Sequence, residues 1–255
     1  MNYSNFNRLR NQDKHEFVQK SLQSVNIRRY ESRDRERIEE ITRSSAMRGR
    51  PLKTYFEDER IVFRIFLDYY LQYEPESCFV AEENGRIIGH VLGCKNTSRY
   101  LRVVLFRYGP EIFGRLCWKL FTGYRYIQTY RTLWWAIIHS WREDPTPKGK
   151  MFPGHLHLGI DQIMRKKGGA SFYACFVKLV DSLITHFLDV GLSGAFAQVA
   201  EPGNQDFVTK RGCALWGFKI AKKLKFSLYS NITGDPWYIK LITINLTENR
   251  SKFRV

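Results

Sequence analysis

The sequence lacks the features that define several protein classes. It has no run of about 18 uncharged apolar residues, so no segment is expected to span a membrane. Its five cysteines are scattered and form no CxxC pair, which argues against a zinc site and a disulfide framework, and no metal site is expected. The stretch from Asn2 to Lys20 is polar and charged, without an apolar signal-peptide segment. We therefore expect a cytoplasmic protein.

Acidic residues are scarce relative to basic ones. The chain has 41 lysines and arginines against 25 aspartates and glutamates, a formal net charge of +16. Such a surface raises encounter rates with polyanions in general. No RRM, KH, zinc-finger or helix-turn-helix signature is present, so specific nucleic-acid recognition is not expected. Weak association with an anionic membrane or another polyanion stays open.

Apolar and aromatic side chains are abundant, at 44% and 15% of the chain. This composition excludes a disordered protein, and 255 residues suffice for one domain with a large core. We expect a polar N-terminal extension over residues 1–24 and a single domain over residues 25–255.

The most specific motif is Arg165-Lys166-Lys167-Gly168-Gly169-Ala170. It lies between a strand-like run, Leu156–Ile160, and a periodic helix, Ser171–Asp189. A glycine turn with basic flanks before a helix binds phosphate, because the first helical N–H groups have no internal partner and the macrodipole is positive there. Its spacing is neither that of a P-loop nor that of a Rossmann turn.

The other expected elements follow a regular order. Two apolar runs flank Asn84-Gly85, which is the strongest short hairpin signal. The remaining predictions are a strand at Val25–Tyr30, a helix at Tyr55–Tyr73, a strand at Ala195–Ala200, and a final antiparallel pair at Lys222–Ser230 and Trp237–Leu246. Gly191 is expected to end the helix that follows the glycine motif.

The motif fits the pattern [Q/R]-x-x-G-x-[G/A], with Arg165, Gly168 and Ala170 in the fixed places. With the hairpin and the late Trp216-Gly217-Phe218, it resembles the GNAT superfamily of acyl-CoA N-acyltransferases over roughly residues 25–95 and 152–247. The resemblance implies an α/β (α+β) fold with a mixed, mostly antiparallel central sheet flanked by helices. It also implies acetyl-CoA as the acyl donor.

Residues 94–153 depart from that pattern as a long insertion between the third and fourth strands, rich in arginine and aromatic residues. We expect two or three helices there. Three roles stay open for the insertion: a wall of the acceptor pocket, a membrane-surface element, or a structural elaboration that could serve as a homodimer contact.

The resemblance also implies a set of cofactor-binding residues. The main chain of strand four would pair with the pantetheine arm, the residues after it would pack beside the arm, and the glycine loop would hold the pyrophosphate. These residues are Leu158, Gly159, Ile160, Ile163, Met164, Arg165, Lys166, Lys167, Gly168, Gly169, Ala170 and, after the fifth strand, Asn204.

The catalytic candidates are histidines. The period of two in a strand places His155, His157 and Gly159 on one face. An imidazole with a pKa near 6.5 suits a general base acting on an amine, with His157 ahead of His155. The alternative is that both are structural hydrogen-bonding residues.

The tyrosine that many GNAT enzymes use to protonate the thiolate is missing. Cys213 stands four residues before Gly217 and is the candidate donor, with a water or Tyr173 as alternatives. The sequence thus predicts an N-acetyltransferase acting on the primary amine of a small acceptor, with an amino sugar first. The competing hypotheses are a non-catalytic CoA- or anion-binding protein and a peripheral membrane acyltransferase.

Overall fold

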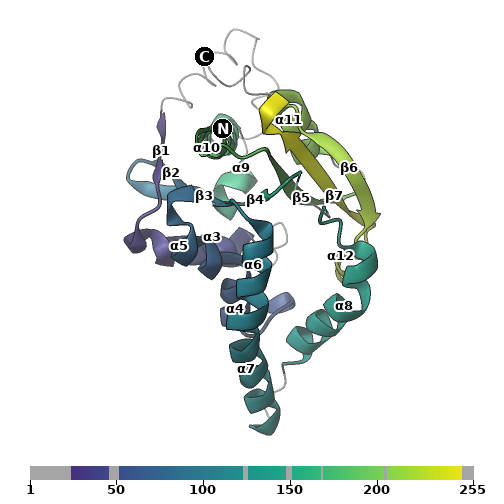
Figure 1. The fold of residues 1–255 in the computed structure, drawn as a ribbon. Coiled ribbons are helices and arrows are strands. Elements are labelled where there is room, and N and C mark those ends of the chain that lie inside the picture. The colour runs from purple at the N-terminus through teal and green to yellow at the C-terminus, as the bar shows by residue number, and fades with distance from the viewer. Residues whose placement is uncertain are drawn as a thin grey trace. The chain divides into compact units, whose positions relative to one another are not determined.

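The computed structural model describes residues 24–45, 52–122, 126–147, 151–167, 169–203 and 206–248. The described strands form one mixed sheet in the order β1-β2-β3-β4-β5-β7-β6 (Figure 1). Four neighbouring pairs are antiparallel and β4–β5 is parallel, which confirms the predicted mixed, mostly antiparallel sheet flanked by helices. By its contacts the chain divides into two compact units, and β4 is shared between them.

The first unit contains residues 1–54, 59–94 and 157–186. Its strands are β1 (Val25–Arg29), β2 (Cys78–Glu83) and β3 (Arg86–Cys94). The β2–β3 hairpin turns at Asn84 and Gly85, whose φ angles are +52° and +74°. Two residues with positive φ match the right-handed twist of the paired strands, so the predicted hairpin is confirmed.

The helices that follow β1 differ in detail from the prediction. After α3 (Arg35–Ser45) and a short 3-10 turn at Leu52–Thr54, α4 (Glu59–Phe63) continues through a π-helical turn, η4 (Arg64–Asp68), into α5 (Tyr69–Tyr73). The predicted helix over Tyr55–Tyr73 is therefore wrong at its start. Residues 55–58 are not helical and belong to the second unit.

A long helix covers the sheet of the first unit. The helix α10 (Ala170–Asp189) buries Ala174, Leu179 and Leu183 completely. Gly89 of β3 lies beneath it, where an added Cβ would meet Cys175 Sγ at 2.7 Å. In length and composition α10 would suffice to cross a bilayer, but 56% of that stretch is buried in the protein, as in the core helix of a globular fold.

The second unit contains residues 55–58, 95–156 and 187–255. The insertion is helical, as predicted: α6 (Thr97–Val103), a π-helical turn η6 (Val104–Tyr108), α7 (Gly109–Phe121) and α8 (Ile127–Glu143). Glu57 fixes the start of α8, because its carboxylate accepts hydrogen bonds from the Gln128 and Thr129 N–H groups at 2.8 Å each.

The rest of the second unit begins at Phe187, in the last turn of α10, and Gly191, with a φ of +75°, ends that helix as predicted. It contains β5 (Gly194–Pro202), α11 (Phe207–Trp216), β6 (Lys219–Lys225), α12 (Ser227–Thr233) and β7 (Trp237–Asn245). The predicted strand Lys222–Ser230 is wrong in its second half, because the chain turns into α12 after Lys225. There Phe226 packs on Tyr229, with ring centroids 4.2 Å apart.

Candidate functional site

The strand β4 (Gly154–Ile160) carries both predicted histidines. His157 belongs to the first unit, where its ring lies 5.9 Å from that of Phe66 and 6.5 Å from that of His90, measured between centroids. Phe66 comes from the π-helical turn η4 and His90 from β3. His157 is thus half-buried in an aromatic setting beside a second imidazole.

His155 has different surroundings, all in the second unit. Its Nδ1 lies 2.8 Å from the Thr97 hydroxyl, and its ring packs edge-on against Tyr100 at 5.0 Å and tilted against Phe196 at 5.4 Å. These contacts give His155 a structural role in holding the start of α6 on the sheet. A catalytic role for it stays a prediction.

His90 was not selected from the sequence, yet it is the most unusual polar residue of the first unit. Its side chain is fully buried, and neither ring nitrogen has a hydrogen-bond partner among the described residues. Most buried polar groups in proteins are hydrogen-bonded, so such exceptions need an explanation. The signal in the sequence was a lone histidine in an otherwise apolar strand, Ile87–Cys94.

Gly159 makes room for the His90 ring. A Cβ at Gly159 would lie 2.6 Å from His90 Nε2, a distance that real side chains do not tolerate. His157 and Gly159 therefore face the same imidazole, as the period of two along β4 predicts. The family resemblance assigned Gly159 to the cofactor, and the structure adds the neighbouring His90 ring as a reason for a glycine at this position.

Burial makes both imidazoles of the first unit weak bases. Removal from water, helped by the nearby His157, lowers the pKa of His90 to about 3. Removal from water likewise lowers the pKa of His157 to about 4. Both rings are therefore neutral at pH 7, and each presents one nitrogen that can accept a proton and one N–H that can donate a hydrogen bond.

The glycine loop lies between two helices rather than between a strand and a helix. The residues after β4 form a short helix, α9 (Gln162–Lys167), and Gly169 then takes a φ of +84° before α10 begins at Ala170. The prediction that Arg165 to Lys167 flank the glycines in a turn is therefore wrong for these three residues. Gly168 and the side chains of Lys166 and Lys167 lie outside the described residues.

The start of α10 is where the sequence predicts a phosphate-binding site. Its first intrahelical bond runs from the Tyr173 N–H to the Gly169 carbonyl at 3.2 Å. The amides of the first turn of an α-helix have no partner within the helix, and such amides bind anions, so a phosphate site here stays a prediction. Of the other residues assigned to the cofactor, Ile160 is buried, Leu158 and Met164 are half-buried, and Ile163 is exposed.

Asp161 fixes the path of the chain into α9. Its carboxylate accepts the Ile163 N–H at 2.8 Å and forms ion pairs with Arg37 and Arg86. Its own N–H donates to the Ile88 carbonyl at 2.8 Å. With these partners Asp161 orients the backbone, and none of its contacts involves the histidines.

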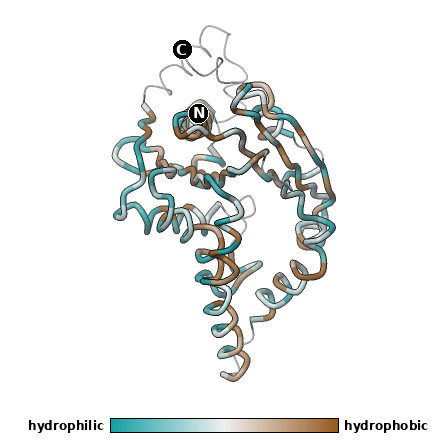
Figure 2. Tube along the Cα trace, viewed as in Figure 1, coloured by the Kyte–Doolittle hydropathy of each residue, from teal (hydrophilic) through white to brown (hydrophobic). Residues whose placement is uncertain are grey.

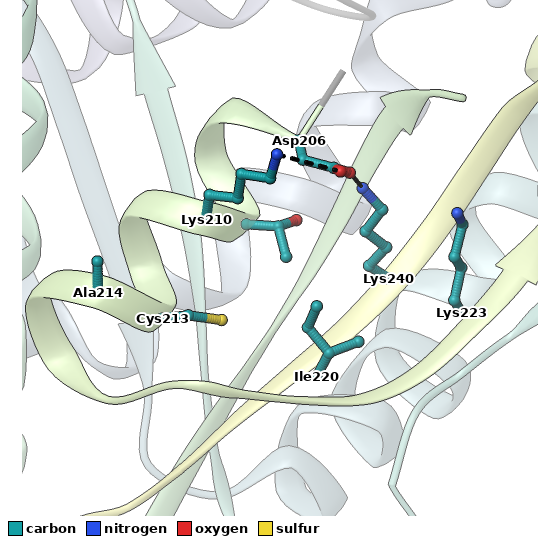
Figure 3. A pocket seen from close by; sticks show the side chains of 8 residues that line it. Asp206, Lys210, Cys213, Ala214, Ile220, Lys223 and Lys240 are labelled. Atoms are coloured by element: carbon teal, nitrogen blue, oxygen red, sulfur yellow. Dashed lines mark hydrogen bonds and ion pairs between the residues drawn. The ribbon is translucent and has the colours of Figure 1, made fainter. Parts of the chain in front are cut away.

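Cys213 lies in the second unit, on α11. It lines a hollow of about 520 Å³ together with side chains of α11, β6 and β7 (Figure 3). The other lining residues are Asp206, Thr209, Lys210, Ala214, Ile220, Lys223 and Lys240. Partial burial raises the pKa of the Cys213 thiol, which therefore carries its proton at neutral pH. Its role as proton donor stays a prediction, and Asn204 lies outside the described residues.

A buried ion pair closes one side of this hollow. Lys240 of β7 places its ammonium 3.1 Å from Glu201 of β5, and it also pairs with Asp206. The Glu201 carboxylate further accepts the Val208 N–H at 2.9 Å and the Thr209 hydroxyl at 2.7 Å. These bonds attach the first turn of α11 to the sheet. Across the described ranges no group of three or more His, Cys, Asp or Glu side chains is arranged to hold a metal ion.

The fold so described is that of the GNAT N-acetyltransferases, as shown by comparison with solved structures. The structure of SsHAT matches with a TM-score of 0.60 at 19% identity, covering 88% of this chain and 98% of that one. A polyamine N-acetyltransferase of Drosophila melanogaster matches with a TM-score of 0.50 at 14% identity, covering 87% and 99%. In sequence, neither a family model nor a curated protein matches the chain.

Proposed function

We propose that the protein transfers the acetyl group of acetyl-CoA to the primary amine of a small acceptor. The observation that carries this proposal is the half-buried, neutral imidazole of His157 on β4, in a chain with the GNAT fold. The N-terminus of α10 supports it, because its amides suit the pyrophosphate of the donor.

In the proposed reaction the neutral amine nitrogen attacks the carbonyl carbon of the thioester. A C–N bond forms and the C–S bond breaks, so that CoA leaves as a thiolate. The proton lost by the nitrogen passes to the unprotonated ring nitrogen of His157, and the thiolate takes a proton from water or from a thiol such as Cys213. Because the pKa of His157 is lowered to about 4, this base is ready at any pH above about 5.

The acceptor that we propose first is an amino sugar, as the sequence suggested. A structural neighbour acts on a polyamine. Here the net charge of +16 disfavours a polycationic acceptor, since like charges repel.

The first test is calorimetric titration of the full chain with acetyl-CoA, CoA and dephospho-CoA. Micromolar binding, equivalent to about −8 kcal/mol, is expected for the first two ligands. Turnover is then followed by thiol release with a panel of amino sugars, amino acids and polyamines. Binding without turnover would favour the non-catalytic CoA-binding alternative, and absence of binding would remove the donor from the proposal.

The second test compares two histidines of the same strand. His157→Gln keeps a hydrogen-bonding side chain but cannot take a proton, so kcat should fall by about a hundredfold or more. The matched control is His155→Gln, whose ring is held by Thr97, and there we expect less than a fivefold change, on the order of what a positioning defect causes. Equal losses in both variants would contradict the role of His157 as base.

A further inference from the structure

The insertion exposes apolar side chains to an extent unlike the rest of the chain. Of the eighteen large hydrophobic residues exposed in the described part of the chain, twelve lie between residues 101 and 141. They are Leu101, Leu105, Phe106, Phe113, Trp118, Leu120, Phe121, Ile127, Trp134, Ile137, Ile138 and Trp141. Scattered exposed apolar residues are normal, but such a concentration in one segment of the chain marks a surface that a membrane or another molecule covers.

The helices of the insertion expose apolar residues and bury polar ones, the opposite of helices in the core of a soluble protein. No residue of α6 or α7 is buried, and the two buried residues of α8 are Thr129 and Thr132. Both threonines are buried for polar reasons: their hydroxyls donate to the Glu57 carboxylate at 2.6 Å and to the Tyr55 carbonyl at 3.0 Å. The large apolar side chains of these helices are exposed instead, and the trace of α7 is coloured largely hydrophobic in Figure 2.

The same helices carry an excess of positive charge. Between Thr97 and Glu143 the sequence has eight basic residues and two acidic residues, Glu111 and Glu143. Arg102 and Arg107 are exposed on the turns that carry Leu105 and Phe106. Arg142 stacks its guanidinium over the Trp141 ring at 4.2 Å. Arginines interleaved with exposed tryptophans are the combination that the headgroup region of an anionic bilayer selects.

We propose that this surface, formed by the twelve residues above and the basic residues among them, binds an anionic lipid bilayer with its helices lying on the membrane. A second copy of the chain fits less well. A two-fold interface would bring exposed arginines such as Arg102, Arg107 and Arg142 against basic residues of the second copy, whereas the cores of interfaces between copies are depleted of charge. The proposal is independent of the acetyltransferase activity, because it concerns binding alone.

The experiment is co-flotation of the full chain with vesicles of phosphatidylcholine alone or with 30 mol% phosphatidylserine, a composition on the order of anionic cell membranes. The protein should float with the anionic vesicles and at least tenfold less with the neutral ones. Raising the salt from about 0.1 M to 0.5 M should weaken binding severalfold, because it screens the electrostatic part. Equal flotation with both vesicles, or none with either, would overturn the proposal.

A matched pair of variants identifies the surface. The triple variant Trp118→Ser/Phe121→Ser/Trp141→Ser removes side chains that are 67%, 88% and 72% exposed and should lose at least tenfold in binding. The control, Val190→Ser/Leu215→Ser/Ile220→Ser, removes three exposed apolar residues elsewhere and should float like the unmodified protein. Circular dichroism confirms that both variants fold.

The charge of the surface is tested separately with Arg102→Glu/Arg107→Glu. We expect this variant to lose binding to anionic vesicles while its oligomeric state is unchanged. Light scattering during size-exclusion chromatography measures the oligomeric state and tests whether the surface binds a second copy of the chain instead. An unmodified protein that is dimeric, and that becomes monomeric in the triple serine variant, would assign the surface to a second copy of the chain and overturn the membrane proposal.

Discussion

Each unit of the protein buries a polar cluster on its sheet, and the two clusters are built in opposite ways. In the second unit, Glu201 and Lys240 are both almost fully buried. The Glu201 carboxylate has three kinds of partner: the Lys240 ammonium, a backbone amide and a hydroxyl. In the first unit, His90 is equally buried but neither nitrogen of its ring has a partner within the described ranges.

The comparison separates a cluster that stabilises the fold from one that costs stability. A buried charge with complete hydrogen bonding fixes the position of α11, whereas removal of a hydrogen-bonding group from water without a partner costs about 1–3 kcal/mol. A fold tolerates such a cost where the group has a use, and perturbed groups cluster at functional sites. The neighbouring His157 and the glycine loop that follows β4 make the first unit the place to look for that use.

The largest expected effect on stability comes from breaking the buried ion pair of Glu201 and Lys240. Lys240→Met leaves Glu201 buried without its cation, and the free energy of unfolding should fall by about 3–5 kcal/mol. Urea denaturation followed by circular dichroism measures it. Lys222→Met, at an exposed position of β6, is the control and should change stability by about 0.5 kcal/mol or less. A loss below about 1 kcal/mol for Lys240→Met would show that the cluster is unimportant.

The second prediction concerns a substitution that crowds the buried His90 ring. Gly159→Ala places a methyl group against the His90 ring and should cost about 1–3 kcal/mol through overpacking. Gly114→Ala in α7 is the control, because nothing lies within 4 Å of its added carbon, and it should stabilise the helix by about 0.5–1 kcal/mol. If the clash is with His90, His90→Ala should largely remove the penalty of Gly159→Ala in a double-mutant cycle.

The third effect is a dependence of stability on pH. Below pH 6.5 an unfolded chain protonates His90, whereas the folded protein does not until about pH 3. The unfolded state therefore binds more protons in this window, and stability falls as the pH falls. From pH 7 to pH 5 this histidine should remove about 2 kcal/mol. His90→Leu should abolish that part of the loss in urea denaturation at the two pH values, and an unchanged pH dependence would contradict it.

The smallest effect concerns His155, which is hydrogen-bonded, in contrast to His90. Thr97→Val removes the two 2.8 Å hydrogen bonds of that hydroxyl, to His155 and to the Pro153 carbonyl, and should cost about 1–2 kcal/mol, the usual net value of one or two such bonds. The control is Thr122→Val, whose hydroxyl bonds to the Trp118 carbonyl at an exposed helix end where water can replace it. Thermal unfolding of the two variants should differ by a few degrees.

Features fixed by neighbouring residues were predictable from the sequence. The hairpin at Asn84-Gly85, the end of α10 at Gly191 and the helical insertion follow from local turn chemistry and periodicity, and the structure confirms them. Local rules did not reveal the short helix α9, because Arg165-Lys166-Lys167 beside two glycines is as typical of a turn as of a helix.

The candidate site was predicted only in part, because some of its residues lie far apart in the sequence. His157 was selected because β4 precedes the glycine loop, which is local information. His90 lies 67 positions earlier (157 − 90), and its importance depends on the pairing of β3 with β4 and on a glycine across the sheet. His157 and Cys213 also belong to different units, which the sequence could not indicate.

The π-helical turn η6 has a consequence for how the insertion can change. A π turn takes up one more residue than an α turn without breaking the helix. Deleting one residue from Val104–Tyr108 should therefore be tolerated and restore a regular helix. Because the wide turn absorbs its extra residue locally, the deletion should leave the direction that α7 faces relative to α6 nearly unchanged. Deleting one residue from the regular part of α7 should instead rotate everything after it by about 100°.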